Sequence, residues 1–134
     1  MNDDPHLRQA CQQQIETLVQ QTLGVVSASV VSGDGFEVAS LLRDDISGDK
    51  LAAMASSLLA LSEAVVQELR MNSCRNIIIE SDRGHVVALR IPASEHELLL
   101  CVLCNDSASL GAVLFAARST AQDIGLGLEQ RADA

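Results

Sequence analysis

Cysteine carries the most reactive side chain in this 134-residue chain, and two of its four cysteines, Cys101 and Cys104, stand at the spacing of half a zinc site. The run Cys-Val-Leu-Cys is strand-like, and no second pair of Cys or His follows at ligand spacing. In a strand, residues three apart point to opposite faces, which argues against a shared metal ion. We therefore expect no metal, and free thiols in packed positions for Cys101, Cys104, Cys11 and Cys74.

The chain also lacks the residues that usually bind nucleotides or carry out acid–base catalysis. A P-loop needs Gly-Lys followed by Ser or Thr, but the single lysine, Lys50, stands between Asp49 and Leu51. The pair Gly33 and Gly35 lacks the third glycine of a dinucleotide site. No acid is placed to orient any of the three isolated histidines, which are His6, His85 and His96. We expect no catalytic residue and no cofactor, so the chain is predicted not to be an enzyme.

Charge and aromatic content exclude further kinds of partner. The formal net charge is -9, which opposes nucleic acid and acidic lipid surfaces because phosphate contacts need clustered cations. With two Phe and no Trp or Tyr, the core must be aliphatic and stacking platforms for bases are missing. The N-terminus is polar and acidic, and no apolar run looks long enough to span a membrane. We expect a cytoplasmic protein that does not insert into membranes.

The chain is organised around a helix expected from Lys50 to Arg70, with Asp49 as its N-cap. Helical periodicity predicts that one apolar sector is buried, namely Leu51, Met54, Ala55, Leu58, Val65, Val66 and Leu69. The opposite side is small and nearly uncharged, with Ala53, Ser56, Ser57, Ala60 and Ala64. We interpret this helix as covered twice, by its own sheet and by the same helix of a second copy. The alternative is an Ala-rich surface helix without a partner.

The rest of the chain predicts a sheet and two more helices. A first helix starts at Asp4-Pro5 and ends at Gly24, and a last helix follows caps at 105–107 and is broken by Gly125 and Gly127. Strands are expected at 25–32, 36–42, 76–80, 85–91 and 98–104, with a turn at 93–97. The fold class is α/β of the α+β type: a five-stranded antiparallel sheet between helix layers, in the order α-β-β-α-β-β-β-α. We expect one domain over 1–134, with a core of about 5–124 and a loose tail at 125–134.

These patterns together resemble one known family. A Gly-rich hairpin in VVSGDGFEVAS, the Ala/Ser-rich helix LAAMASSLLALSEAVVQEL, and the segments RNIIIESDRGHVVALRI and LLLCVLCN are similar to the Roadblock/dynein light chain family, and nearest to its bacterial MglB-like branch. The resemblance covers roughly residues 7–124. It implies a Roadblock-like fold that dimerises through the middle helix and an edge strand at 75–82. Ile77 and Ile79 of that strand then join the small helix residues in the dimer interface.

Two functions remain open. The resemblance implies a non-catalytic homodimeric regulator or scaffold that binds a Ras-like small GTPase and modulates its nucleotide cycle or localisation. We expect the polar end of the paired helices to face the GTPase through Glu63, Gln67 and Arg70, together with Arg43 from the preceding connector. The alternative is a small-molecule sensor domain with a pocket between sheet and helix, although such pockets usually contain more aromatic residues.

Overall fold

One antiparallel sheet forms the centre of the computed structural model, which describes residues 4–92 and 97–132. In that part of the chain the sheet has five strands in the spatial order β2-β1-β5-β4-β3. The elements are α1 (Pro5–Gln21), β1 (Val25–Ser32), β2 (Glu37–Leu41), α2 (Gly48–Glu68), β3 (Asn76–Ser81), β4 (Gly84–Ile91), β5 (Leu98–Asn105) and α3 (Leu110–Ala132). The predicted fold class and element order are confirmed.

Strand β5 lies in the middle of the sheet because it is apolar on both sides. It pairs with β1, where Cys101 faces Ser29, and with β4, where Cys101 faces Ala88. Most of its side chains are buried, including Leu98, Leu99 and Leu100. A strand without a polar face is stable only when both faces of the sheet are covered.

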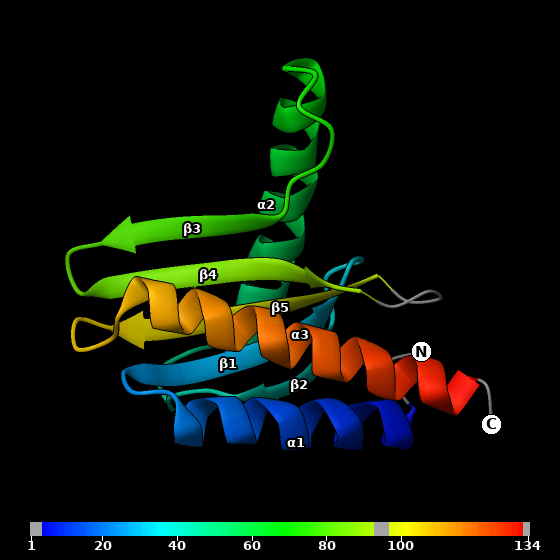
Figure 1. Ribbon diagram of the computed structural model, residues 1–134, viewed down its shortest axis with the longest axis vertical. Coiled ribbons are helices and arrows are strands. Elements are labelled where there is room, and N and C mark those ends of the chain that lie inside the picture. The colour runs from blue at the N-terminus through cyan, green and yellow to red at the C-terminus, as the bar shows by residue number, and fades with distance from the viewer. Residues whose placement is uncertain (1–3, 93–96, 133–134) are drawn as a thin grey trace.

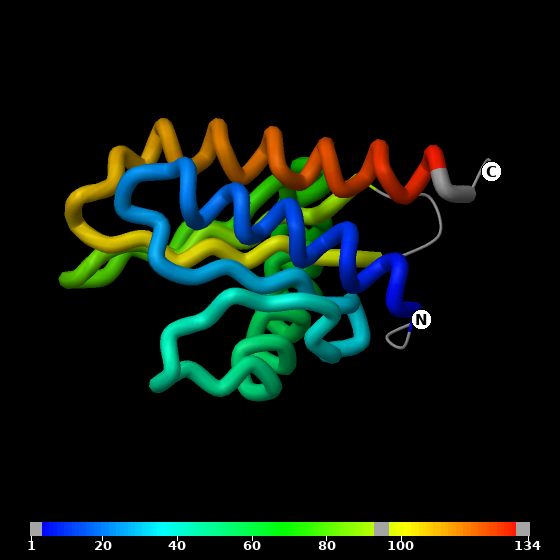
Figure 2. Tube along the Cα trace, turned by 90° about the horizontal axis from the view of Figure 1, so that it is seen from below, coloured from blue at the N-terminus to red at the C-terminus, as the bar shows by residue number. Residues whose placement is uncertain are grey.

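The helices cover the two faces unequally, as Figures 1 and 2 show. Helices α1 and α3 lie side by side on one face, and α2 crosses the other face. The larger core lies under α1 and α3 and contains Ile15, Val30, Leu100, Val113 and Ile124 among others. The smaller core lies under α2 and contains Val31, Ala52, Ala55, Leu59, Ala88, Leu99 and Cys101. The sheet therefore separates two cores of different size.

The ends of the helices differ in part from the prediction. Asp4 caps α1 as expected, since its carboxylate accepts hydrogen bonds from the backbone N–H of His6 at 2.9 Å and of Leu7 at 3.4 Å. In α2 the N-cap is Ser47 and not Asp49, because Ser47 Oγ accepts from Lys50 N at 3.3 Å. Asp49 instead lies in the first turn, where a negative charge still favours the helix dipole.

Helix α3 also corrects the sequence-based interpretation at both ends. At its start Ser109 Oγ accepts from Ala112 N at 3.3 Å, whereas the predicted cap Asn105 accepts from Ser107. At its end the helix continues through Gly125 and Gly127 to Ala132, so the prediction of a break at these glycines is wrong. The looseness of the tail stays a prediction. Gly125 has a packing role, since a Cβ there would lie 2.1 Å from the Pro92 carbonyl oxygen.

One predicted segment cannot be compared. The turn expected at 93–97 falls on residues 93–96, which lie outside the described residues, and His96 lies there with it.

Candidate interaction site

Helix α2 buries only a narrow stripe against its own sheet. The fully buried side chains of α2 are Ala52, Ala55 and Leu59. In Figure 1 the C-terminal half of the helix continues past β3, beyond the edge of the sheet. This half has no sheet beneath it, so its apolar side chains stay in contact with solvent.

The large apolar residues of α2 form an exposed stripe, which corrects the prediction that this sector is buried. Met54, Leu58, Leu61, Val65 and Leu69 are all exposed, with Leu61 at 64% and Leu69 at 61%. Of the predicted sector Ala55 is buried as expected, but the rest of the sheet side is formed by Ala52 and Leu59. The small Ala52 and Ala55 let the helix lie close to the strands. Leu51 and Val66 are half-buried. A stripe of this kind on a single chain marks an interaction surface.

The small residues lie beside that stripe. Ala53, Ser57, Ala60 and Ala64 are exposed, and Ser56 is half-buried. Ser57 Oγ donates to the Ala53 carbonyl at 3.0 Å, so its polar group is satisfied within the helix. We name the two stripes together the α2 face, comprising Ala53, Met54, Ser57, Leu58, Ala60, Leu61, Ala64, Val65 and Leu69. Its centre allows another helix to approach closely, and its margin offers large apolar contacts.

Strand β3 adds an edge to this surface. It pairs with β4 alone, so its other side is an unpaired sheet edge within the described residues. Ile77 packs against the smaller core, while Ile78 and Ile79 are 42% and 41% exposed. Edge strands with exposed apolar side chains favour pairing with another strand.

Glu63 connects α2 to the strands behind it. Its Oε1 accepts a hydrogen bond from Cys74 N at 2.9 Å and lies 3.3 Å from Nη2 of Arg90. The side chain is only 16% exposed. Glu63 was predicted to face a GTPase, but in the described chain its carboxylate holds the loop between α2 and β3. A contact of Glu63 with a partner stays a prediction.

The end of α2 is closed by a Schellman motif with Arg70 in the left-handed position. Met71 N donates to the Val66 carbonyl at 2.9 Å, and Arg70 N donates to the Gln67 carbonyl at 3.0 Å. Arg70 has φ 56°, a conformation that favours glycine. The backbone therefore holds Arg70 in a defined place at the exposed tip of the helix.

Arg43 lies away from the other three predicted partner-facing residues. Its Nε is 3.3 Å from Asp45 Oδ1, and both side chains are exposed. Arg43 precedes the N-terminus of α2, whereas Gln67 and Arg70 lie at its other end, and a helix of 21 residues is about 30 Å long. The chain thus brings Glu63, Gln67 and Arg70 together and leaves Arg43 apart.

The cysteines have the geometry expected from the strand pattern. Cys101 lies in the smaller core and Cys104 in the larger core, on opposite faces of β5. Burial raises the pKa of the Cys101 thiol to about 11, which makes it a poor nucleophile. Cys11 is also buried, and Cys74 is half-buried in the loop before β3. The residues described contain no group of three or more His, Cys, Asp or Glu arranged for a metal ion.

The structure also contains a cleft that sequence reasoning missed. It lies between α3 and the ends of β3 and β4 and has a volume of about 730 Å³. Three arginines line it: Arg75, Arg90 and Arg118. They are far apart in the sequence and follow no motif, so only the packing of α3 on the sheet reveals that they share a site.

Helix α2 is long and apolar enough to cross a membrane, contrary to the sequence-based expectation. No other helix in the described part of the chain meets both conditions. Core helices of soluble proteins share this length and composition. In the fold α2 packs on the sheet through Ala52, Ala55 and Leu59, and Glu63 forms an ion pair with Arg90.

Comparison with known proteins identifies relatives of the whole fold. A family model described as the Roadblock/LC7 domain matches residues 12–103. The uncharacterized protein MJ1340 of Methanocaldococcus jannaschii is 28% identical over 104 residues, which are 78% of this chain and 88% of that protein. A Roadblock/LC7 domain from Streptomyces avermitilis is 28% identical with a TM-score of 0.59, covering 83% of this chain and 94% of the other. MglB of Myxococcus xanthus superposes with a TM-score of 0.82 at 14% identity, covering 92% and 90% of the two chains.

Proposed function

The chain belongs to the Roadblock/LC7 domain family, and from this premise we propose that it is a non-catalytic, homodimeric regulator or scaffold in the cytoplasm that binds a Ras-like small GTPase. In this role it modulates the nucleotide cycle or the localisation of the GTPase. The observation that carries the proposal is the exposed α2 face next to an unpaired β3 edge. The fold likeness to MglB supports the choice of branch.

The homodimer is supported by the shape and chemistry of these two surfaces. Two α2 helices pack against each other through the small residues Ala53, Ser56, Ser57, Ala60 and Ala64, and the larger apolar side chains of the α2 face close over the contact. The β3 edges of the two copies pair, which brings Ile77 and Ile79 into the interface and joins two sheets into one. Such an assembly covers the exposed leucines that a single chain leaves in water.

The GTPase is proposed to bind at the tip of the paired helices. Gln67 and Arg70 are exposed there, with Glu63 beneath them. Arg70 occupies a left-handed position that glycine adopts at lower energy, which supports a role for its side chain rather than its backbone. The acidic chain also attracts basic patches on a partner. Arg43 belongs to this surface only if a second copy brings its own Arg43 near the tip.

The mechanism we propose is indirect. The chain positions the mobile loops of the GTPase, and the GTPase supplies all catalytic groups for hydrolysis. His6 lies at the start of α1 and His85 at the start of β4, so neither belongs to the proposed GTPase surface.

The test measures binding and GTP hydrolysis by small GTPases of the same organism. We expect one of them to bind the wild-type protein, with Arg70→Ala weakening binding about tenfold, the loss of a typical charge-assisted contact. Arg43→Ala should have a smaller effect, and Arg83→Ala, in the turn between β3 and β4, serves as the control. Stimulation lost in Arg43→Ala or Arg70→Ala while binding persists contradicts the indirect mechanism. Absence of any bound GTPase contradicts the function itself.

A second candidate function, a small-molecule sensor, is favoured by one observation. The cleft between α3 and the sheet has the size of a ligand site, since such sites are typically about 300–1,000 Å³. A purified protein that binds small molecules in this cleft but no GTPase supports the sensor.

A further inference from the structure

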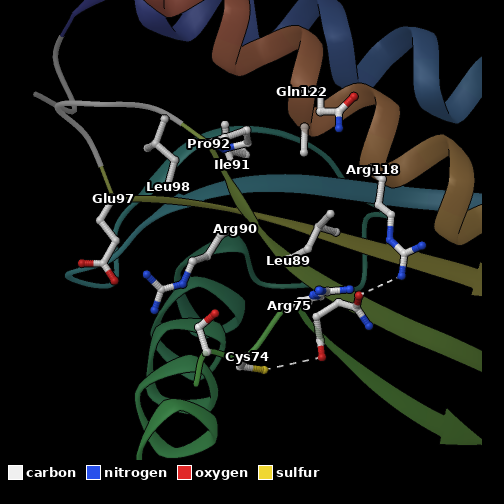
Figure 3. A pocket seen from close by; sticks show the side chains of 13 residues that line it. Cys74, Arg75, Leu89, Arg90, Ile91, Pro92, Glu97, Leu98, Arg118 and Gln122 are labelled. Carbon is white, nitrogen blue, oxygen red and sulfur yellow. Dashed lines mark hydrogen bonds between the residues drawn. The ribbon is translucent and has the colours of Figure 1, made fainter. Parts of the chain in front are cut away.

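The cleft beside α3 exists because α3 covers only part of the sheet. The helix packs on β4 and β5, and it contacts the start of β3 through the Arg118 side chain, which hydrogen-bonds Asn76. Figure 3 shows the cleft from close by. One wall comes from the loop and first residues of β3, and the other comes from Arg118, Ala121 and Gln122 of α3. Its floor is aliphatic and consists of Leu89, Ile91, Pro92 and Leu98.

The charge of the cleft is opposite to that of the protein. The chain has nine Lys and Arg and a net charge of -9, yet Arg75, Arg90 and Arg118 all line this one cleft. Glu97 is the carboxylate among the lining residues. Figure 3 shows Arg75 and Arg118 at one side of the cleft and Arg90 with Glu97 at the other. A local excess of positive charge in an acidic protein concentrates anions at that place.

The guanidinium groups differ in how far they are already paired. Arg90 is 3.3 Å from Glu63, so its charge is largely balanced. Arg118 Nη2 donates to Asn76 Oδ1 at 3.1 Å. A guanidinium group has five N–H donors, so this bond leaves Arg118 further donors for a ligand. Within residues 4–92 and 97–132, the Arg75 guanidinium has no hydrogen bond or ion pair. Arg75 and Arg118 line the same cleft, and Figure 3 shows both side chains at the same side of it, so both groups are available to a single ligand.

The rest of the lining restricts the kind of anion. Two planar guanidinium groups match the oxygens of a phosphate or a carboxylate. The floor offers aliphatic contacts, and the lining contains no aromatic side chain on which a base would stack. A bare inorganic ion would leave the floor unused, and a nucleotide would lack its stacking partner.

We propose that this cleft binds a small organic anion, with its phosphate or carboxylate group on Arg75 and Arg118 and its aliphatic part on Leu89, Ile91 and Pro92. Arg90 and Gln122 lie at the margin of the site. The proposal is separate from the GTPase function, since the anion is held by Arg75, by Arg118 of α3 and by aliphatic residues of the cleft, whereas the GTPase is proposed to bind at the tip of α2. The two sites adjoin at Arg90, which pairs with Glu63 of α2.

The test is a titration of the full-length protein, followed by amide chemical shifts in NMR. The probes are butyl phosphate, pentanoate, inorganic phosphate and butanol. We expect one site per chain for butyl phosphate or pentanoate, weaker binding of inorganic phosphate, and none of butanol. The ratio of the first two affinities identifies the preferred acidic group. Binding should weaken with added salt, because the contacts are between exposed charges.

Matched variants locate the site. Arg75→Gln and Arg118→Gln should each weaken binding about tenfold or more, since each removes a charged donor. Arg83→Gln, an arginine in the turn between β3 and β4, should bind as the wild type does. All three side chains are exposed, so circular dichroism should show an unchanged fold.

Alkylation of Cys74 gives a second readout. Cys74 lines the cleft and is half-buried, whereas Cys11, Cys101 and Cys104 are buried. Bound butyl phosphate should slow the reaction of Cys74 with N-ethylmaleimide, and butanol should not. The proposal is overturned if neither butyl phosphate nor pentanoate binds, if inorganic phosphate binds equally well, if Arg75→Gln binds normally, or if only an acidic peptide is retained.

Discussion

Arg70 and Glu63 show how single residues prepare the surface around the end of α2. Arg70 ends the helix in a left-handed conformation, and Glu63 holds the following loop through Cys74 N and Arg90. Neither role is visible in helical periodicity, which assigns both residues simply to the polar end of α2. The loop before β3 is therefore ordered by contacts within the chain, and its exposed side chains are presented from a fixed backbone.

Arg70→Gly is predicted to stabilise the protein by about 0.5–1 kcal/mol, because glycine adopts the left-handed position without a Cβ clash. Urea unfolding measures the change. Arg70→Ala is the control, since it removes the same charge but keeps the strain, and it should leave stability nearly unchanged. A less stable Arg70→Gly variant would mean that contacts of the arginine side chain outweigh the strain.

The raised pKa of the Cys101 thiol predicts that the free energy of unfolding decreases at alkaline pH. Burial raises its pKa from 9.0 to about 11 in the folded chain, so the unfolded chain loses its thiol proton first. The stabilisation is complete below about pH 9 and is lost as the pH rises towards 11, by about 2–3 kcal/mol at most. Apart from its four thiols the chain offers few groups to titrate in this range, since it has no Tyr and one Lys. Urea unfolding at pH 8 and pH 10.5 should show a smaller loss for Cys101→Ala than for the wild type, and equal losses would contradict the prediction.

Among the elements, α2 and α3 differ in how they pack on the sheet. Helix α3 buries Val113, Ala117, Ala121 and Ile124 along its length. Helix α2 buries little and exposes large side chains, because it crosses the sheet and runs past its edge. The same apolar periodicity thus produces a core face in one helix and an interaction face in the other.

The two glycines near the end of α3 form a matched pair for a prediction. A Cβ at Gly125 would lie 2.1 Å from the Pro92 carbonyl oxygen, whereas Gly127 has nothing within 4 Å. Gly125→Ala should destabilise the protein by about 1–3 kcal/mol, as overpacking does. Gly127→Ala should stabilise it by up to about 1 kcal/mol through helix propensity. Thermal unfolding of both variants checks the prediction, and effects of the same sign would contradict it.

For the whole molecule, the unequal helix layers are the main feature. Two helices cover most of one face of the sheet. In the part of the chain that the structure describes, the single helix on the other face leaves apolar surface open beside the outer edge of β3, which has no strand paired to it. The net charge of -9 keeps copies apart in general, so association requires a specific apolar contact. The α2 face offers such a contact.

Ala60→Arg is predicted to convert a dimer into a monomer. Ala60 is exposed on the α2 face, and an arginine there places a charge in a close helix contact at a cost of several kcal/mol, about 3–5 if the charge stays unpaired. Sedimentation at micromolar concentration measures the association. Ala112→Arg, on the exposed side of α3, is the control and should remain dimeric. A monomeric wild type, or unchanged association of Ala60→Arg, would contradict the proposed dimer.

Most of the fold could be predicted from local sequence patterns. The Asp4-Pro5 start of α1, the run of β5 and the order of elements depend on residues close together in the chain, whose preferences act within a few positions. The prediction that the helix breaks at Gly125 and Gly127 is wrong because it, too, used only local preferences. Local propensity disfavours glycine in a helix, but the close approach of Pro92 requires it at 125.

The sequence by itself determined the element order, the central place of β5 and the opposite faces of Cys101 and Cys104, because the two-residue period of a strand and helix capping are local properties. Only the tertiary structure decided which side of α2 meets the sheet, since several of its sides are apolar and periodicity cannot rank them. It also decided that Arg75, Arg90 and Arg118 share a cleft. Residues so far apart in the chain come together only through the packing of α3 against β4.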